Sequence, residues 1–218
     1  MYCPEIFAEQ RPEVLQALVQ DHPLAILVTR DGERLEANHI PLLLSVDAGS
    51  MSLHGHLARA NPLWRDQPAD GEVLVIFQGP QLYISPSWYA TKKETGRVVP
   101  TWNYIVAHVY GSLQIHDDPA WIRQQMGSLT AQQEASLAEP WQVADAPRDF
   151  TERLIQQVTG IEIPITRWLG KWKVSQNQPG ENQESIWENL KALGEPQSQA
   201  MAGAVRRATG DLEKGPTQ

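Results

Sequence analysis

The sequence has one cysteine and no long apolar run. With only Cys3 among 218 residues, an internal disulfide framework is excluded. No apolar segment approaches the roughly 20 residues that a membrane-spanning helix needs. The N-terminus also lacks a basic region followed by an apolar one, which is the pattern of a signal peptide. We therefore expect no membrane partner and, as the default, a cytoplasmic location.

Positive charge is scarce as well. Lys and Arg total 18 against 26 Asp and Glu, so the formal net charge is −8 at pH 7. A field of this sign repels nucleic acid, so binding to DNA would need a local basic patch. The candidate clusters are small, and solvated surface charge is the simpler interpretation of each: Lys92, Lys93 and Arg97; Arg167, Lys171 and Lys173; Arg206 and Arg207.

The common catalytic signatures are missing. The chain has no HExxH, no P-loop and no GxGxxG, and its serines lack the nucleophile-elbow context, which disfavours Ser–His–Asp hydrolysis. His54 and His56 share one face of a predicted strand because side chains alternate along a strand, but a metal ion needs a third ligand. His39 and His108 are available, yet no Glu or Cys joins them in a recognised spacing. We expect no metal site.

What is present is an ordinary globular composition, 41% hydrophobic and 20% charged, which suffices for a sizeable core. Asp31-Gly32 predicts a hairpin turn, Gly79-Pro80 a break between two strands, and Pro164 an edge or a bulge in the last strand. The predicted strands cover residues 24–29, 35–45, 51–56, 73–77, 81–85, 100–115 and 159–172. The predicted helices cover residues 11–21, 60–66, 149–158, 183–193 and 197–207, with another that begins after Asp117-Asp118-Pro119.

This pattern predicts a mainly β protein with peripheral helices (α+β). The simplest architecture is a small closed or nearly closed antiparallel barrel of six to seven strands. With no internal repeat and no dividing linker in the sequence, residues 1–193 would form the barrel domain with its helical decorations. Residues 194–218 would form a helical C-terminal extension that frays after Gly210.

The stretch from Leu53 to Trp64 carries the clearest binding signal. It begins as the end of a strand and turns into a short helix, so backbone N–H groups are exposed at the junction. Arg59 adds a cation there, beside His54, His56 and Asn61. Such a set suits a phosphate or a carboxylate, although an arginine at the start of a helix is usually an ordinary surface residue.

Two later segments offer further contacts. After a long polar loop over residues 86–99, Trp102-Asn103-Tyr104 could stack on a planar ring and hydrogen-bond its edge. The alternative is a strand that alternates core aromatics with a solvent-facing amide. Lys171 and Lys173 are followed by Gln176, which gathers cations and amides at a strand end. The alternative there is a solvated edge strand whose lysines oppose aggregation.

Several separated blocks together resemble a known family. In order, they are Met1-Tyr2-Cys3-Pro4; Ala37-Asn38-His39-Ile40-Pro41; Leu53-His54-Gly55-His56-Leu57-Ala58-Arg59-Ala60-Asn61-Pro62; Tyr83-Ile84-Ser85-Pro86-Ser87-Trp88-Tyr89; Val99-Pro100-Thr101-Trp102-Asn103-Tyr104; and Gly170-Lys171-Trp172-Lys173-Val174-Ser175-Gln176-Asn177. On these blocks the chain resembles, to about Leu193, the FMN-binding split-barrel regulators of the PaiB type. These are related to pyridoxamine-phosphate-oxidase-like flavoproteins. The resemblance implies a split β-barrel and a homodimer with FMN at the subunit interface.

The resemblance also implies a cofactor site. By position, Arg59 would hold the FMN phosphate, with His56 and Asn61 near it. The other implied cofactor residues are Asn38 and His39 beside the isoalloxazine or ribityl chain, His54 in the same pocket, Trp102, Asn103 and Tyr104 completing it, and then Lys171 and Gln176. No residue is assigned a catalytic role.

Three functions stay open at this point. The first is a flavin-dependent sensor or negative transcriptional regulator. The second is a flavin-dependent oxidoreductase or a haem-handling protein on the same fold, in which His54, His56 and His108 would serve haem. Because flavin carries the redox chemistry itself, side chains alone do not separate these two. The third is a plain DNA-binding repressor, which the acidic charge and the lack of a clear helix-turn-helix disfavour.

Overall fold

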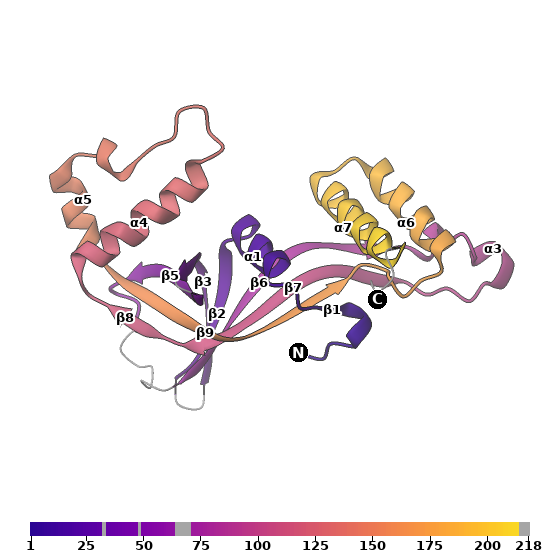
Figure 1. Cartoon of the computed structure of the whole chain (residues 1–218), viewed down its shortest axis with the longest axis horizontal. Helices are drawn as coiled ribbons and strands as arrows, with labels where there is room; N and C mark the ends of the chain where they lie inside the picture. Colours follow the sequence, from indigo (N-terminus) through magenta and orange to yellow (C-terminus); the bar gives the residue numbers. More distant parts are fainter. Residues whose placement is uncertain (32–33, 48, 64–70, 214–218) are drawn as a thin grey trace. The chain divides into compact units, whose positions relative to one another are not determined.

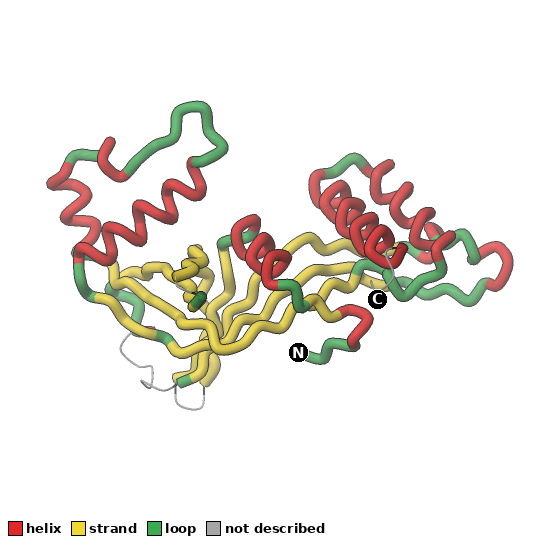
Figure 2. The backbone as a smooth tube through the Cα atoms, in the orientation of Figure 1, coloured by secondary structure: helices red, strands yellow, loops and turns green. Residues whose placement is uncertain are grey.

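The chain forms one antiparallel sheet, and segments from most of the chain contribute strands to it (Figure 1 and Figure 2). The computed structural model describes residues 1–31, 34–47, 49–63 and 71–213. Its strands are β1 (Ala8–Glu9), β2 (Leu24–Asp31), β3 (Arg34–Pro41), β4 (Leu43–Asp47), β5 (Ser50–Ala58), β6 (Glu72–Ile84), β7 (Thr101–Ser112), β8 (Gln114–His116) and β9 (Val158–Lys173). Their order across the sheet is β3-β2-β6-β7-β9-β5-β4, with β1 and β8 both paired to β9.

The chain divides into two compact units. The first unit consists of Met1–Arg11, Gln78–Ala107 and Leu169–Gln218, and the second unit consists of Pro12–Phe77 and His108–Trp168. The strands β6, β7 and β9 are long enough to contribute residues to both units. The predicted cofactor residues are therefore divided between the two units.

The second unit contains two hairpins and most of β9. β2 pairs with β3 along its whole length, which confirms the predicted hairpin, while its turn at Gly32 lies outside the described residues. β4 pairs with β5. Along β5 the side chains alternate between two faces, so Leu53 and Leu57 are buried on one of them. Ile163 of β9 lies opposite Leu53 in register and is also fully buried. This inner face of β5 and β9 is part of the hydrophobic core.

Helices flank the sheet in both units. They are α1 (Pro12–Asp21), α4 (Pro119–Glu134) and α5 (Arg148–Ile155) in the second unit, α3 (Lys92–Thr95), α6 (Gly180–Leu193) and α7 (Pro196–Glu213) in the first, and the 3-10 turns η1 (Glu5–Phe7), η2 (Pro86–Trp88) and η3 (Val143–Asp145). The start predicted for α4 is confirmed, since the Asp118 side chain accepts a hydrogen bond from the Ala120 N–H at 2.9 Å. No helix of the described ranges is long and apolar enough to cross a bilayer.

Two sequence predictions about strands are wrong. Gly79-Pro80 does not interrupt a strand, because β6 runs unbroken from Glu72 to Ile84. Both residues can adopt extended backbone, and the fixed φ of proline lies in that region. The run 35–45 is not one strand either. It divides at Leu42, which is fully buried and donates its N–H to the Pro23 carbonyl at 2.9 Å. With this division and the short strands β1 and β8, the described residues form nine strands where the sequence predicts six to seven.

Of the two positions predicted for Pro164, an edge or a bulge, the edge is wrong, and the bulge stays a prediction. The strand of Pro164, β9, lies between β7 and β5 in the sheet. Pro164 stands opposite Ser52 at the end of the β5–β9 register, where its missing N–H removes no bond from the interior of that ladder. The helical turn predicted over 60–66 and the frayed tail predicted after Gly210 fall partly outside the described residues and stay predictions.

Candidate functional site

The outer face of β5 gathers polar side chains from three strands of the second unit. His54 and His56 lie on the face opposite the buried Leu53 and Leu57, because side chains alternate along a strand. In register, Glu162 of β9 lies opposite His54. Directly opposite residues project from the same side of a sheet, so this carboxylate and this imidazole meet on the outer face. The prediction that the two histidines share a face is confirmed.

Glu162 stands between two imidazoles. Its Oε2 accepts a hydrogen bond from Nε2 of His116 on β8 at 2.8 Å, and its Oε1 lies 3.5 Å from Nε2 of His54. The same nitrogen of His54 lies 2.7 Å from Oγ of Ser52. Burial lowers the pKa of His54, and the nearby Glu162 carboxylate offsets only part of that effect. The His54 imidazole is therefore neutral at pH 7.

Helix α4 covers this face with an indole and an amide. The Trp121 ring is stacked on the His116 imidazole, with centroids 4.1 Å apart, and lies 5.3 Å from the His54 ring. Gly160 makes this approach possible, since a Cβ at that position would overlap the Trp121 ring. The Gln125 Oε1 accepts a hydrogen bond from His56 Nδ1 at 2.8 Å. Both predicted histidines are thus held by partners on neighbouring elements.

Arg59 lies just beyond the end of β5, as predicted, and its guanidinium already has protein partners. Nε donates to the Gln156 carbonyl at 3.1 Å, and Nη2 donates to the Val158 carbonyl at 3.0 Å. Nη1 lies 3.1 Å from Oδ1 of Asp117. The side chain is 36% exposed, so solvent and ligands still reach it. The arrangement fixes a cation at the strand end and places a carboxylate beside it.

Asn61 and Asn38 are brought together. The Asn61 Nδ2 donates to the Asn38 Oδ1 at 2.9 Å, which ties the turn after β5 to β3. The Asn61 Oδ1 accepts a hydrogen bond from the Leu63 N–H at 3.0 Å. His39 follows Asn38 on β3 and is exposed. Six of the predicted cofactor residues therefore belong to the second unit, on β3, on β5 and in the turn after β5.

The other five belong to the first unit. Trp102 is 55% exposed and makes an edge-to-face contact with Tyr83, with centroids 6.1 Å apart. Together with Trp88, these rings line a hollow of about 480 Å³. Asn103, in contrast, is fully buried, and its amide exchanges two hydrogen bonds with the Ser175 hydroxyl at 2.9 and 3.1 Å. For Asn103 the alternative of a solvent-facing amide is therefore wrong, because its side chain points into the interior of this unit.

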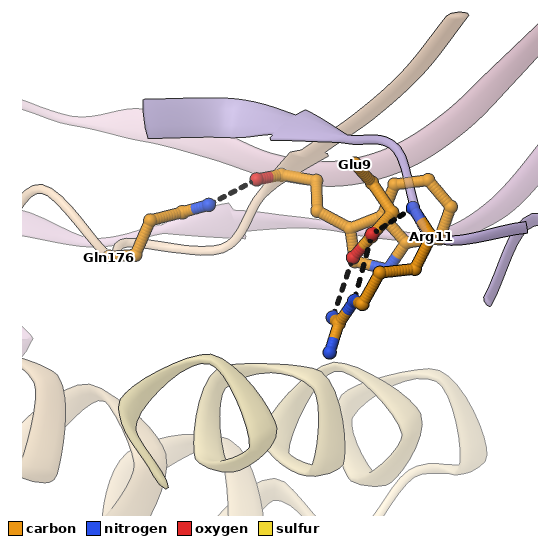
Figure 3. Close-up of polar contacts among 4 residues, drawn as sticks. Glu9, Arg11 and Gln176 are labelled. Atoms are coloured by element: carbon orange, nitrogen blue, oxygen red, sulfur yellow. Dashed lines mark hydrogen bonds and ion pairs between the residues drawn. The ribbon is translucent and has the colours of Figure 1, made fainter. Parts of the chain in front are cut away.

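Lys171 and Gln176 are also engaged by the protein. The Lys171 Nζ donates to the Tyr2 carbonyl at 3.0 Å and lies 5.3 Å from the centroid of the Tyr104 ring. Lys171 is only 8% exposed, so the alternative of a solvated lysine is wrong at this position. The Gln176 side chain bonds the backbone at Trp172 and Val174. Figure 3 shows Gln176 together with the Glu9–Arg11 ion pair of the same unit.

Sequence reasoning missed the residues that hold the predicted ones. Glu162, Trp121, Gln125 and Asp117 are all partners of the predicted histidines or of Arg59. A signal existed for Glu162, a lone carboxylate between the apolar Ile161 and Ile163 of a predicted strand. Within the described ranges, no group of three or more His, Cys, Asp or Glu is arranged to hold a metal ion.

Comparisons with known proteins give a consistent result. Residues 1–167 match the family model described as "Putative FMN-binding domain". The chain is 35% identical to the uncharacterized protein AN0679 of Emericella nidulans, over 94% of this chain and 96% of the relative. It is 28% identical to the protease synthase and sporulation protein PAI 2 of Bacillus subtilis, over 93% and 95%. The solved structure of the FAD and heme binding protein from Mycobacterium smegmatis has a TM-score of 0.56 at 15% identity, over 76% of this chain and 73% of that chain. The chain has the split-barrel α+β fold, which confirms the predicted fold class.

Proposed function

Because the chain belongs to this FMN-binding domain family, we propose that it binds FMN and acts as a flavin-dependent sensor or negative transcriptional regulator. The resemblance to the PaiB type is confirmed by the family and by the Bacillus relative. The single observation that carries the proposal is the match over residues 1–167. That stretch contains every predicted cofactor residue except Lys171 and Gln176.

The phosphate end of FMN needs a cation and N–H donors. We assign it to Arg59, with His56 and Asn61 beside it. The guanidinium supports this assignment, since it lies at the end of β5 and is partly exposed. Asp117 already pairs with Nη1, so a dianionic phosphate would compete with this carboxylate for the same donor. Arg59, His56 and Asn61 are residue types that suit a phosphate. Binding it through Nη1 requires the Asp117 carboxylate to move away from that nitrogen.

The ribityl chain and ring are assigned to residues near that end. Asn38 is bonded to Asn61, so a ligand at Arg59 would lie close to the amide of Asn38. His39, exposed on the same strand, is assigned to the ring or the ribityl chain, and His54 keeps its predicted place in the pocket. Flavin supplies the redox chemistry when it is bound, and these side chains would hold and orient it.

The first-unit residues divide into two roles. We assign Trp102 to stacking on a planar group, which its exposure and the neighbouring hollow support. The Asn103 amide bonds the Ser175 hydroxyl and the Gln176 amide bonds the Trp172 carbonyl, so we assign both residues to shaping this region. Tyr104 and Lys171, in contact through the cation–π pair, receive the same positioning role.

A homodimer is part of the proposal. Large apolar side chains stay exposed on and near α4 and α5, with Leu137, Trp141 and Phe150 at 53%, 46% and 47%. Large aromatic and aliphatic side chains left exposed in this part of the chain support an association surface there. Sedimentation velocity with and without FMN tests the assignment, and a monomer at micromolar concentration in both conditions would refute it.

The named relatives support two candidate roles. The Bacillus relative is named for protease synthesis and sporulation, which supports a regulator. The mycobacterial structure is named as binding FAD and heme, and the shared fold makes an oxidoreductase or a haem-handling protein the second candidate. DNA is the less favoured partner because the net charge is −8.

Titration with FMN under visible absorption tests the cofactor first. We expect saturable binding at micromolar FMN, and no binding at that level would refute the proposal. The loaded protein is then mixed with NADPH. A regulator should show no turnover, whereas steady flavin reduction supports the oxidoreductase. A Soret band on titration with haem supports the haem variant, and a salt-dependent mobility shift by the FMN-free protein supports the plain repressor.

A further inference from the structure

A small polar pocket of about 110 Å³ lies between α4 and the outer face of β4 and β5, within the second unit. Its walls include Leu43 and Ser45 of β4, His54 of β5, and Trp121, Gln125 and Ser128 of α4. Leu43 lies opposite His54 in the β4–β5 register, so both side chains project from the same side of the sheet. Strands β4 and β5 therefore line one side of the pocket, and helix α4 lines the other.

Gln125 lines this pocket with a buried side chain. It is 3% exposed, and its Oε1 is taken by the His56 Nδ1. Its Nε2 is buried and has no hydrogen-bond partner among the described residues. Reversing the amide would only exchange the two atoms, since the oxygen would then be left without a donor. A buried polar atom without a hydrogen bond destabilises the folded protein, and a ligand that accepts this hydrogen bond would remove the cost.

The charge of the walls defines the ligand. None of the described residues lining the pocket is Lys, Arg, Asp or Glu. The His54 imidazole is neutral, because burial lowers its pKa, and the Glu162 carboxylate lies beyond it. A bound anion would therefore find no cation in the pocket walls, and the nearby Glu162 carboxylate would repel it. The flat Trp121 ring and the Leu43 side chain favour a planar molecule with an apolar part.

We propose that this pocket binds a small neutral carbonyl compound of the carboxamide class, whose oxygen accepts a hydrogen bond from the Gln125 Nε2. A volume of 110 Å³ equals the share of roughly four water molecules in the liquid, about 30 Å³ each. Bonded atoms take less room than separate water molecules, so a ligand of about five heavy atoms fits this space, whereas the three-ring isoalloxazine does not. The pocket shares His54 with the proposed FMN site but is too small for the flavin ring, so its ligand is a second, smaller molecule.

Propanamide is the probe, with propanoate and propylammonium as the charged analogues of the same size. Binding is followed by ligand-observed NMR on the full chain, both FMN-free and FMN-loaded. We expect propanamide to bind with a Kd in the millimolar range, as ligand efficiency allows for about five heavy atoms. Both ions should bind at least about tenfold more weakly, since a desolvated charge here has no partner.

Two matched variants test the donor. Gln125→Met keeps the length of the side chain and removes the amide, so propanamide affinity should fall at least about tenfold, the loss expected for one hydrogen bond. Gln133→Met makes the same change at an exposed position of α4 and should bind as the parent does. If Gln125→Met does not fold, Ser128→Leu replaces it, because a leucine at this exposed pocket residue would occupy the space.

Three results would overturn the proposal. The first is no propanamide binding to the parent protein at tens of millimolar. The second is equal affinity in the Gln125→Met protein, or in Ser128→Leu where that variant replaces it. The third is loss of propanamide binding on saturation with FMN, which would assign the acceptor to a flavin carbonyl. Failure of FMN to bind, with propanamide binding intact, would refute the proposed function and leave this pocket supported.

Discussion

Nη1 of Arg59 lies 3.1 Å from Oδ1 of Asp117, so the cation assigned to the FMN phosphate already has a carboxylate beside it. We predict that Arg59→Lys raises the Kd for FMN about tenfold, or ~1.4 kcal/mol. An ammonium cannot present the parallel donors of a guanidinium to a phosphate. Asp117→Asn should lower the Kd by roughly two- to fivefold, as removal of a partly exposed like charge allows.

Fluorescence titration of FMN measures both changes. Asp149→Asn is the charge-matched control, since it removes an exposed carboxylate that pairs with Arg153 on α5. Its Kd should equal that of the parent. Unchanged FMN affinity in Arg59→Lys would assign the phosphate elsewhere, and a weaker affinity in Asp117→Asn would mean that Asp117 positions the guanidinium rather than competing for it.

Removing the Arg11 guanidinium from its ion pair with Glu9 should lower the stability of the fold in a pH-dependent way (Figure 3). The Arg11 side chain donates to both carboxylate oxygens, at 3.0 Å from Nε and 2.7 Å from Nη2, and Glu9 is only 9% exposed. Removing the guanidinium leaves a buried carboxylate with fewer donors. Arg11→Met should therefore lower the free energy of unfolding at pH 7 by about 1–2 kcal/mol.

The pH dependence of this pair has a definite sign. Burial alone would raise the pKa of Glu9, but the hydrogen bonds and charge of Arg11 lower it below 4.5 overall. The stabilisation is therefore present above pH 4.5 and is lost as the pH falls through the folded pKa. Urea unfolding at pH 7 and at pH 3.5 measures it. Arg153→Met, which removes an exposed ion pair, is the control and should cost about 0–1 kcal/mol. An equal loss in both variants would contradict the prediction.

Local patterns gave much of the fold. The long strand over 159–172, the hairpin at Asp31-Gly32 and the Asp118 cap of α4 all follow from alternation, turn chemistry and capping over a few residues. The division of the run 35–45 did not, because it depends on a hydrogen bond between Leu42 and Pro23. Tertiary contacts of this kind override local periodicity.

The site was predicted in its residue types more than in its contacts. Two histidines on one face and an arginine after the strand followed from spacing alone. The Glu162 carboxylate opposite His54 did not, because the β5–β9 register joins segments far apart in the chain. The unpartnered amide of Gln125 was equally hidden, since a glutamine in a helix predicts a solvated side chain.

Ser175 adopts a left-handed backbone conformation, with φ at 67°, and is the only non-glycine residue of the described ranges with positive φ. Its hydroxyl bonds the fully buried amide of Asn103. Ser175→Ala keeps the strained backbone and leaves the amide without this partner, so it should cost about 1–3 kcal/mol. Ser175→Gly loses the same bonds but relieves the strain, and should be less destabilising by about 1 kcal/mol. Urea denaturation ranks the two, and the reverse order would mean that the conformation carries no strain.

Burial lowers the pKa of His54 below its ordinary value of 6.5, with Glu162 opposing this effect. The unfolded chain then binds more protons than the folded one between the two pKa values, so the free energy of unfolding rises with pH through that window and falls as the solution is acidified from pH 7.5. We predict that His54→Gln flattens this slope, because a glutamine does not titrate. The same change at the exposed His39 should leave the slope intact. Chemical unfolding at half-unit steps from pH 5 to 7.5 decides it. An equal slope in His54→Gln and the parent would mean that Glu162 and Ser52 hold the imidazole as well when it is charged as when it is neutral.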